Sequence, residues 1–73
     1  MIKKNYGIKG KLAYNKMLLD LVKQYEKEYR ATGEGNVALE NKLRQYDIET
    51  NFAVDVIFFT DWHTDEVLYS FEL

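Results

Sequence analysis

The apolar residues of this chain are spaced as in a helix over its first half and as in strands over its last third. This change of period constrains the fold more than any other feature. Between residues 11 and 31 one stripe recurs at every third or fourth position: Tyr14, Leu18, Leu21, Val22, Tyr25 and Tyr29. Residues 52–59 and 66–73 instead alternate and are rich in β-branched and aromatic side chains. The pattern predicts a long helix followed by an antiparallel β-hairpin.

A second, shorter helix is predicted over residues 37–46. Gly33 is suited to end the first helix, because glycine readily adopts the positive φ of a helix C-terminus. Asn36 is suited to cap the second helix. Residues 2–8 alternate weakly, which indicates an N-terminal edge strand. We therefore expect an α+β fold in which one long and one short helix pack on a C-terminal antiparallel hairpin, with that edge strand as a third.

Length and composition limit the class of protein. The 73 residues predict a single domain, 1–73, and a chain this short buries only about 60% of its unfolded surface. With no cysteine, disulfides and thiolate metal sites are excluded. With 47% hydrophobic residues, the chain is too apolar to be disordered. Lysines interrupt the N-terminal region, so we expect no signal peptide or membrane span and a cytoplasmic location.

The charges are sorted along the chain. Residues 1–30 contain eight Lys or Arg residues and three acidic ones, whereas residues 31–73 contain two basic and nine acidic residues. A separation of this kind must be satisfied within the fold or by a partner. It therefore raises two interpretations, one for each end of the chain.

The basic end suggests nucleic-acid binding. Clustered cations neutralise phosphates, and two helices joined by a short glycine-bearing link resemble a helix-turn-helix arrangement. The candidate residues are Lys9, Lys11, Lys16, Lys42 and Arg44. Against this interpretation, the second helix carries Glu40, and most of the acidic charge lies on the hairpin. Lysines on an amphipathic helix are also ordinary solvent-facing residues.

The polar cluster at residues 61–66 offers little for catalysis. Asp61, His63 and Asp65 alternate and could ligate a divalent metal, but their spacing matches no EF-hand loop or HExxH motif. Aspartates are also common in hairpin turns for backbone reasons. His63 is the sole histidine and Ser70 the sole serine, without a nucleophile motif. We expect no enzyme activity, no metal and no cofactor.

The acidic hairpin suggests protein binding instead. Trp62 falls at its predicted tip, and tryptophan is enriched at interface hot spots, although it could also fold back onto the hairpin. The predicted partner-binding residues are Trp62, Asp61, Asp65, Glu66, Asp55 and Phe59. The predicted partner is a larger protein or nucleoprotein complex with a basic surface.

The expected function is that of a small, non-catalytic regulatory module. The composition is similar in style to small phage and plasmid proteins that inhibit host enzymes, and an inhibitor role is the expectation that this similarity gives. A structural homodimer or larger homo-oligomer, in which the basic helix meets the acidic hairpin of a neighbour, is a further alternative. The sequence does not determine which face of the hairpin is buried.

Overall fold

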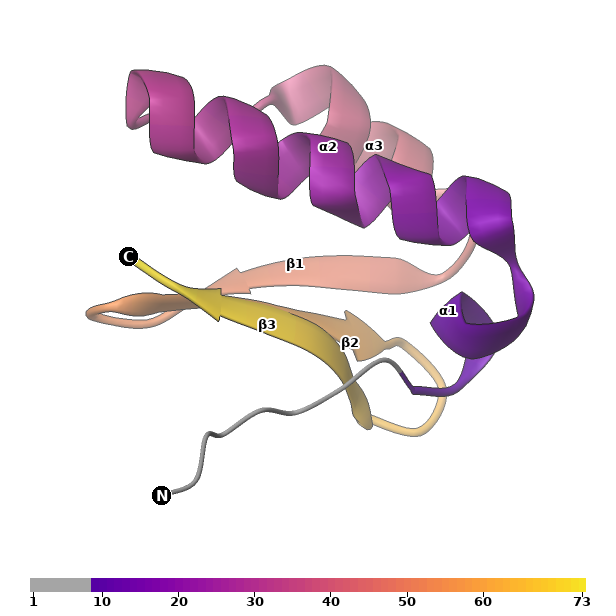
Figure 1. Cartoon of the computed structure of the whole chain (residues 1–73). Coiled ribbons are helices and arrows are strands. Elements are labelled where there is room, and N and C mark those ends of the chain that lie inside the picture. The colour runs from indigo at the N-terminus through magenta and orange to yellow at the C-terminus, as the bar shows by residue number, and fades with distance from the viewer. Residues whose placement is uncertain (1–8) are drawn as a thin grey trace.

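Three helices precede a three-stranded antiparallel sheet in the computed structural model, which describes residues 9–73. The strand order is β1-β2-β3, and α2 and α3 both lie on one side of the sheet (Figure 1). The elements are α1 (Lys11–Tyr14), α2 (Lys16–Thr32), α3 (Val37–Arg44), β1 (Ile48–Phe52), β2 (Val56–Asp61) and β3 (Val67–Glu72).

The ends of the helices follow from local backbone chemistry. The side chain of Asn36 accepts a hydrogen bond from the amide of Leu39 and caps α3, as predicted. Gly33 ends α2 with a φ of 78°, also as predicted. The predicted long helix is interrupted at Asn15, whose extended backbone separates α1 from α2. Its side chain accepts from Leu18 N at 3.2 Å, so the interruption creates a new cap.

The α+β class and the predicted C-terminal hairpin are confirmed, since β2 and β3 pair antiparallel, but the sheet has a different third strand and different strand bounds. The third strand is β1, which directly precedes β2 in the chain, and the predicted N-terminal strand over residues 2–8 lies outside the described residues. The predicted 52–59 strand is also divided, because Ala53 N donates to Val56 O and closes a turn. β1 then pairs antiparallel with β2, from Ile48 opposite Asp61 to Phe52 opposite Ile57.

The core lies between the sheet and the helices. Within residues 9–73 it contains ten buried apolar side chains: Leu12, Leu18, Val22, Tyr25, Leu43, Ile48, Ile57, Phe59, Leu68 and Phe71. Alternation along β2 therefore sends Ile57 and Phe59 inward and leaves Val56 and Phe58 on the other face. A register shift between Phe59 and Thr60 accommodates an extra residue on β3, Leu68, which is also buried. Lys9 N donates to Leu68 O and joins the chain before α1 to β3.

Two tyrosine–glutamate hydrogen bonds tie the elements together. Tyr25 of α2 donates to Glu40 of α3 at 2.5 Å, and Tyr69 of β3 donates to Glu26 of α2. Gly35 leaves room for the first bond, because a Cβ there would lie 2.8 Å from the Glu40 carboxylate.

Among the described residues, no helix is long and apolar enough to cross a membrane.

The Tyr69 bond makes stability sensitive to alkaline pH. Burial and the hydrogen bond to Glu26 raise the pKa of Tyr69 to about 12, above the value of about 10 expected in the unfolded chain. Between these values the native state retains a proton that the unfolded chain loses. The contribution of Tyr69 is therefore complete below pH 10 and is lost as the pH rises through that window.

We predict that Tyr69→Phe lowers the free energy of unfolding by about 1 kcal/mol at neutral pH, because one hydrogen bond is lost. The variant should then lose less stability than the wild type between pH 9 and pH 12. Urea unfolding across this range measures both effects. Tyr14→Phe is the control, since Tyr14 is 92% exposed, and it should follow the wild type. Parallel curves for Tyr69→Phe and the wild type would contradict the prediction.

Candidate functional site

The turn between β2 and β3 is shaped by the side chain of Asp61. Its Oδ1 accepts a hydrogen bond from the amide of His63 at 2.8 Å, while its carbonyl accepts from Asp65 N at 2.8 Å. Asp65 has a φ of 63°, and Glu66 N donates to the Thr64 hydroxyl. These bonds stabilise the turn locally and hold its acidic side chains at one end of the sheet.

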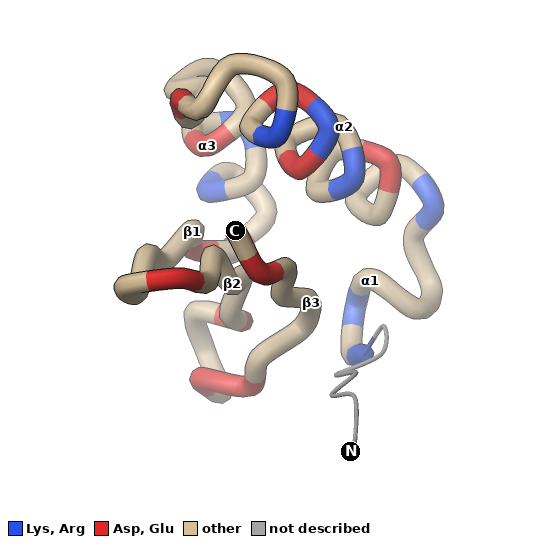
Figure 2. The backbone as a smooth tube through the Cα atoms, turned by 60° about the vertical axis from the view of Figure 1, so that its left-hand side comes forward, with Lys and Arg blue, Asp and Glu red and all other residues tan. Residues whose placement is uncertain are grey.

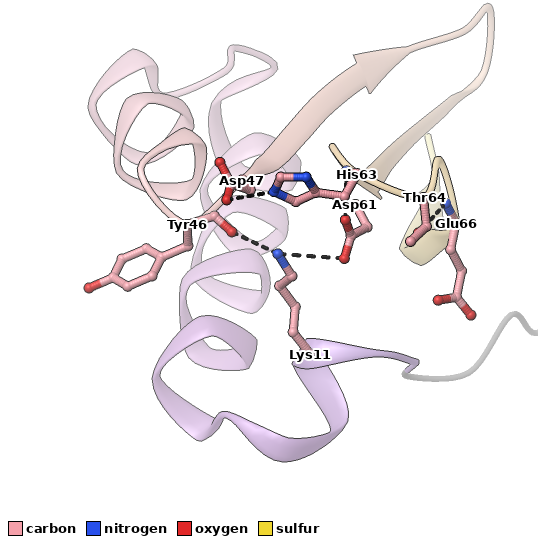
Figure 3. Close-up of polar contacts among 7 residues, drawn as sticks. All are labelled: Lys11, Tyr46, Asp47, Asp61, His63, Thr64 and Glu66. Carbon is pink, nitrogen blue, oxygen red and sulfur yellow. Dashed lines mark hydrogen bonds and ion pairs between the residues drawn. The ribbon is translucent and has the colours of Figure 1, made fainter.

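Lys11 connects this turn to the end of α3 (Figure 3). Its Nζ donates to the carbonyl of Tyr46 at 2.9 Å and lies 3.5 Å from Asp61 Oδ2. The bond from His63 N and the nearby Lys11 ammonium lower the pKa of Asp61. Asp47 completes the connection, because its carbonyl accepts from Trp62 N at 2.8 Å. We call the contacts among Lys11, Tyr46, Asp47, Asp61 and His63 the Lys11 clasp.

His63 contributes to the same clasp. Its Nε2 lies 3.0 Å from Asp47 Oδ2. Asp47 has a φ of 63° and lies in the link between α3 and β1. The clasp therefore joins α1, this link and the β2–β3 turn, which are far apart in the sequence.

Trp62 lies at a shallow pocket beside the clasp. Arg44, Asp47, Ile48 and Glu49 line this pocket with Trp62, and its volume is about 340 Å³. The indole is 61% exposed, so Trp62 does not fold back into the core. Two carboxylates and one guanidinium make the charged lining negative overall. An exposed indole beside carboxylates can receive a cationic side chain by cation–π attraction and charge-assisted hydrogen bonds.

The charges are separated in space as well as in sequence. Residues 47–73, which form the sheet and its turns, contain no lysine or arginine. They contain seven acidic residues: Asp47, Glu49, Asp55, Asp61, Asp65, Glu66 and Glu72. In Figure 2 the lysines and arginines of the described residues lie on the helices and the short segment before α1, whereas the sheet and its turns carry acids alone.

The predicted partner-binding residues do not form one patch. Trp62, Asp61, Asp65 and Glu66 lie together around the β2–β3 turn. Asp55 lies in the β1–β2 turn, at the opposite end of β2. Phe59 is fully buried and packs edge-to-face on Tyr25, with ring centroids 5.6 Å apart. The prediction of Phe59 as a partner-binding surface residue was therefore wrong, because alternation along β2 directs its side chain into the core.

The residues predicted to bind nucleic acid also do not form one patch. Lys11 belongs to the clasp, Lys16 pairs with Asp20 at 3.1 Å, and Arg44 lines the Trp62 pocket. Lys9 is exposed just before α1, and Lys42 is exposed in the last turn of α3. The set therefore includes groups that already have acidic neighbours.

The metal-ligand pattern at Asp61, His63 and Asp65 is not assembled as a ligand set. Asp61 is bonded to the His63 amide and lies near Lys11, while the His63 ring meets Asp47. Within residues 9–73, no group of three or more histidine, cysteine or acidic side chains could hold a metal ion.

Sequence reasoning missed Asp47, Glu49 and Arg44 as neighbours of Trp62. They reach it through the pairing of β1 with β2, and the polar sequence of β1 had not indicated a strand. The one local signal was Asp47 itself, which directly follows the predicted second helix. Aspartate tolerates the positive φ of a tight turn, and Asp47 has a φ of 63°. Comparisons with protein-family models, curated proteins and solved structures found no match to this chain.

We predict that Lys11→Met lowers the melting temperature by about 4–8 °C, because the bond to the Tyr46 carbonyl is worth about 1 kcal/mol in so small a domain. The emission of Trp62, the only tryptophan, should also change as the turn loosens. Calorimetry and fluorescence measure the two effects. Lys16→Met is the control, because the Lys16–Asp20 pair is exposed and should contribute little. A Lys11→Met variant as stable as this control would contradict the clasp.

Proposed function

We propose that this chain is a small, non-catalytic protein-binding module that occupies a basic surface on a larger protein or nucleoprotein complex. The observation that carries the proposal is the Trp62 pocket beside a sheet that, with its turns (residues 47–73), has seven acidic residues and no lysine or arginine. Such a module would act as a regulator or inhibitor by denying that surface to its usual ligand.

The charge distribution supports a basic partner. A surface of one sign attracts an opposite surface over a distance comparable to the Debye length, and this mainly increases the association rate. Because the cations of the described residues lie on the helices and just before α1, the sheet side is the side that such a partner would meet.

The Trp62 pocket supplies the short-range part of the contact. An exposed tryptophan gains a large contact area at a low entropic cost, and a few residues of this kind carry most of the affinity of an interface. We propose that an arginine or lysine of the partner lies over the indole and pairs with the carboxylates of Asp47 and Glu49.

Nucleic-acid binding and homo-oligomer formation stay as alternatives with less support. The helix layer carries cations, but acids such as Asp20, Glu26 and Glu28 are interspersed with them on α2. A phosphate backbone would also be repelled by the neighbouring sheet. Binding to a second copy would have to join a helix layer of mixed charge to the acidic sheet.

We predict that Trp62→Ala combined with Asp65→Lys lowers capture of the partner from extracts of the native host by about tenfold or more. Quantitative mass spectrometry of the captured proteins measures this change. The matched control is Val37→Ala with Glu34→Lys, which also truncates one exposed apolar side chain and reverses one exposed acid, but on the helix side. Circular dichroism checks that both variants fold.

Undiminished capture by the Trp62 variant would overturn the proposal. An equal loss in the control would also overturn it, since the binding surface would then not be the Trp62 end of the sheet.

A further inference from the structure

The face of the sheet opposite α2 and α3 carries an apolar groove that the core does not use. Val56, Phe58, Val67 and Ser70 line it, and its volume is about 240 Å³. Phe58 lies opposite Asn51 on β1 and Ser70 on β3, so its ring is the largest apolar group among its cross-strand neighbours. These four residues are half-buried, whereas Ile57 and Phe59 on the same strand are fully buried on the helix side. We call this surface the open face.

The open face has an acidic border. Strand alternation places Glu49 of β1 on the same side as Phe58, two positions from Asn51. Glu72 of β3 lies opposite Val56 and is exposed. The groove is thus flanked on both outer strands by a carboxylate. Arg44 lines the Trp62 pocket together with Glu49, but within residues 9–73 neither Glu49 nor Glu72 forms an ion pair.

We propose that the open face binds a basic amphipathic segment of a partner protein. Apolar side chains of the segment pack on Val56, Phe58 and Val67, and its lysines or arginines face Glu49 and Glu72. This inference rests on the proposed protein-binding function but names a second surface, which adjoins the Trp62 pocket at Glu49, and the chemistry of its ligand. The apolar groove provides the affinity, and the two carboxylates select a basic segment over an acidic one.

Charge complementarity decides among the occupants. A second copy docked face to face would bring acidic borders together without a cation between them, and like charges held close are unfavourable. Nucleic acid and anionic lipid are repelled by the same carboxylates. A basic segment with an apolar side satisfies both the groove and its border.

The test uses the full chain and a labelled synthetic helical peptide of about 18 residues, with leucines on one side and lysines on the other. The control peptide has the same sequence with glutamates in place of the lysines. Fluorescence anisotropy should show the basic peptide binding at least about tenfold more tightly than the acidic one, with affinity that falls as salt rises. Equal binding of the two peptides, or no binding of the basic one, would overturn the proposal.

Variants then locate the peptide. Phe58→Thr with Val67→Thr places a β-branched residue suited to a strand at both positions and should weaken binding by about tenfold. Val54→Thr is the matched control, because Val54 is 99% exposed in the β1–β2 turn and outside the groove. Glu72→Gln should weaken binding by about threefold, whereas Glu34→Gln on the helix side should not. Unchanged affinity in the Phe58–Val67 variant would overturn the proposal.

Two further variants separate this inference from its rivals. Trp62→Ala should retain peptide binding within about twofold. A loss of binding confined to that variant would assign the peptide to the Trp62 pocket. That result would overturn this inference but support the proposed function.

Residues 1–8 are themselves basic and apolar in sequence. If Ile2→Ser with Tyr6→Ser tightens peptide binding about tenfold, the occupant is the chain's own N-terminal segment, and the proposal fails. Sedimentation of the wild type as a dimer that dissociates in the Phe58–Val67 variant would also overturn it, in favour of a second copy.

Discussion

Tyr25 of α2 packs edge-to-face on Phe59 of β2, in the core between the helix layer and the sheet. The rest of the architecture depends on this one-sided packing. The helices cover the Ile57 and Phe59 face of β2, and so short a chain has few residues left for a second covering layer. The Phe58 face is consequently free of the helices that hold the fold together. Within residues 9–73, the packing that stabilises one side of the sheet thus leaves the Phe58 side without a layer of helices.

Local sequence signals predicted the elements that are specified locally. The apolar stripe on α2, the glycine at its end and the Asn36 cap each depend on residues within a few positions of one another, and the structure has all three. The interruption at Asn15 was missed because the helical spacing of apolar residues in the sequence continues across it, from Tyr14 to Leu18, although Tyr14 is 92% exposed in the structure. β1 was missed because only its alternate residues Ile48, Thr50 and Phe52 face the helices, and Thr50 is polar. Its strand character comes from pairing with β2, which is a non-local property.

The candidate site could be predicted only in part, for the same reason. The sequence identified Trp62 and the acids of the β2–β3 turn, because turn residues and charge can be counted along the chain. It could not separate the two faces of β2, so Phe59 was assigned to the surface and Asp55 to the same patch as Trp62. A shift of one position exchanges the buried and exposed sets of a strand, and only packing with the helices decides between them. The Asp47–Trp62 bond likewise joins residues that no local pattern connects.

The absence of cations from residues 47–73 has consequences for both proposed surfaces. An ion pair between Glu49 or Glu72 and a Lys or Arg of the chain would weaken the preference of these carboxylates for an external cation. Within residues 9–73 no such pair is present, although Arg44 lines the Trp62 pocket together with Glu49. Lys11 illustrates the alternative, since it pairs with Asp61 and its ammonium is committed to holding the turn in place. One acid of the sheet is thus used to position the turn that holds Trp62, while Glu49 and Glu72 form no ion pair within residues 9–73 and lie at the borders of a groove. The Trp62 pocket and the open face then present carboxylates beside apolar surface to the same kind of partner, one that is both basic and apolar.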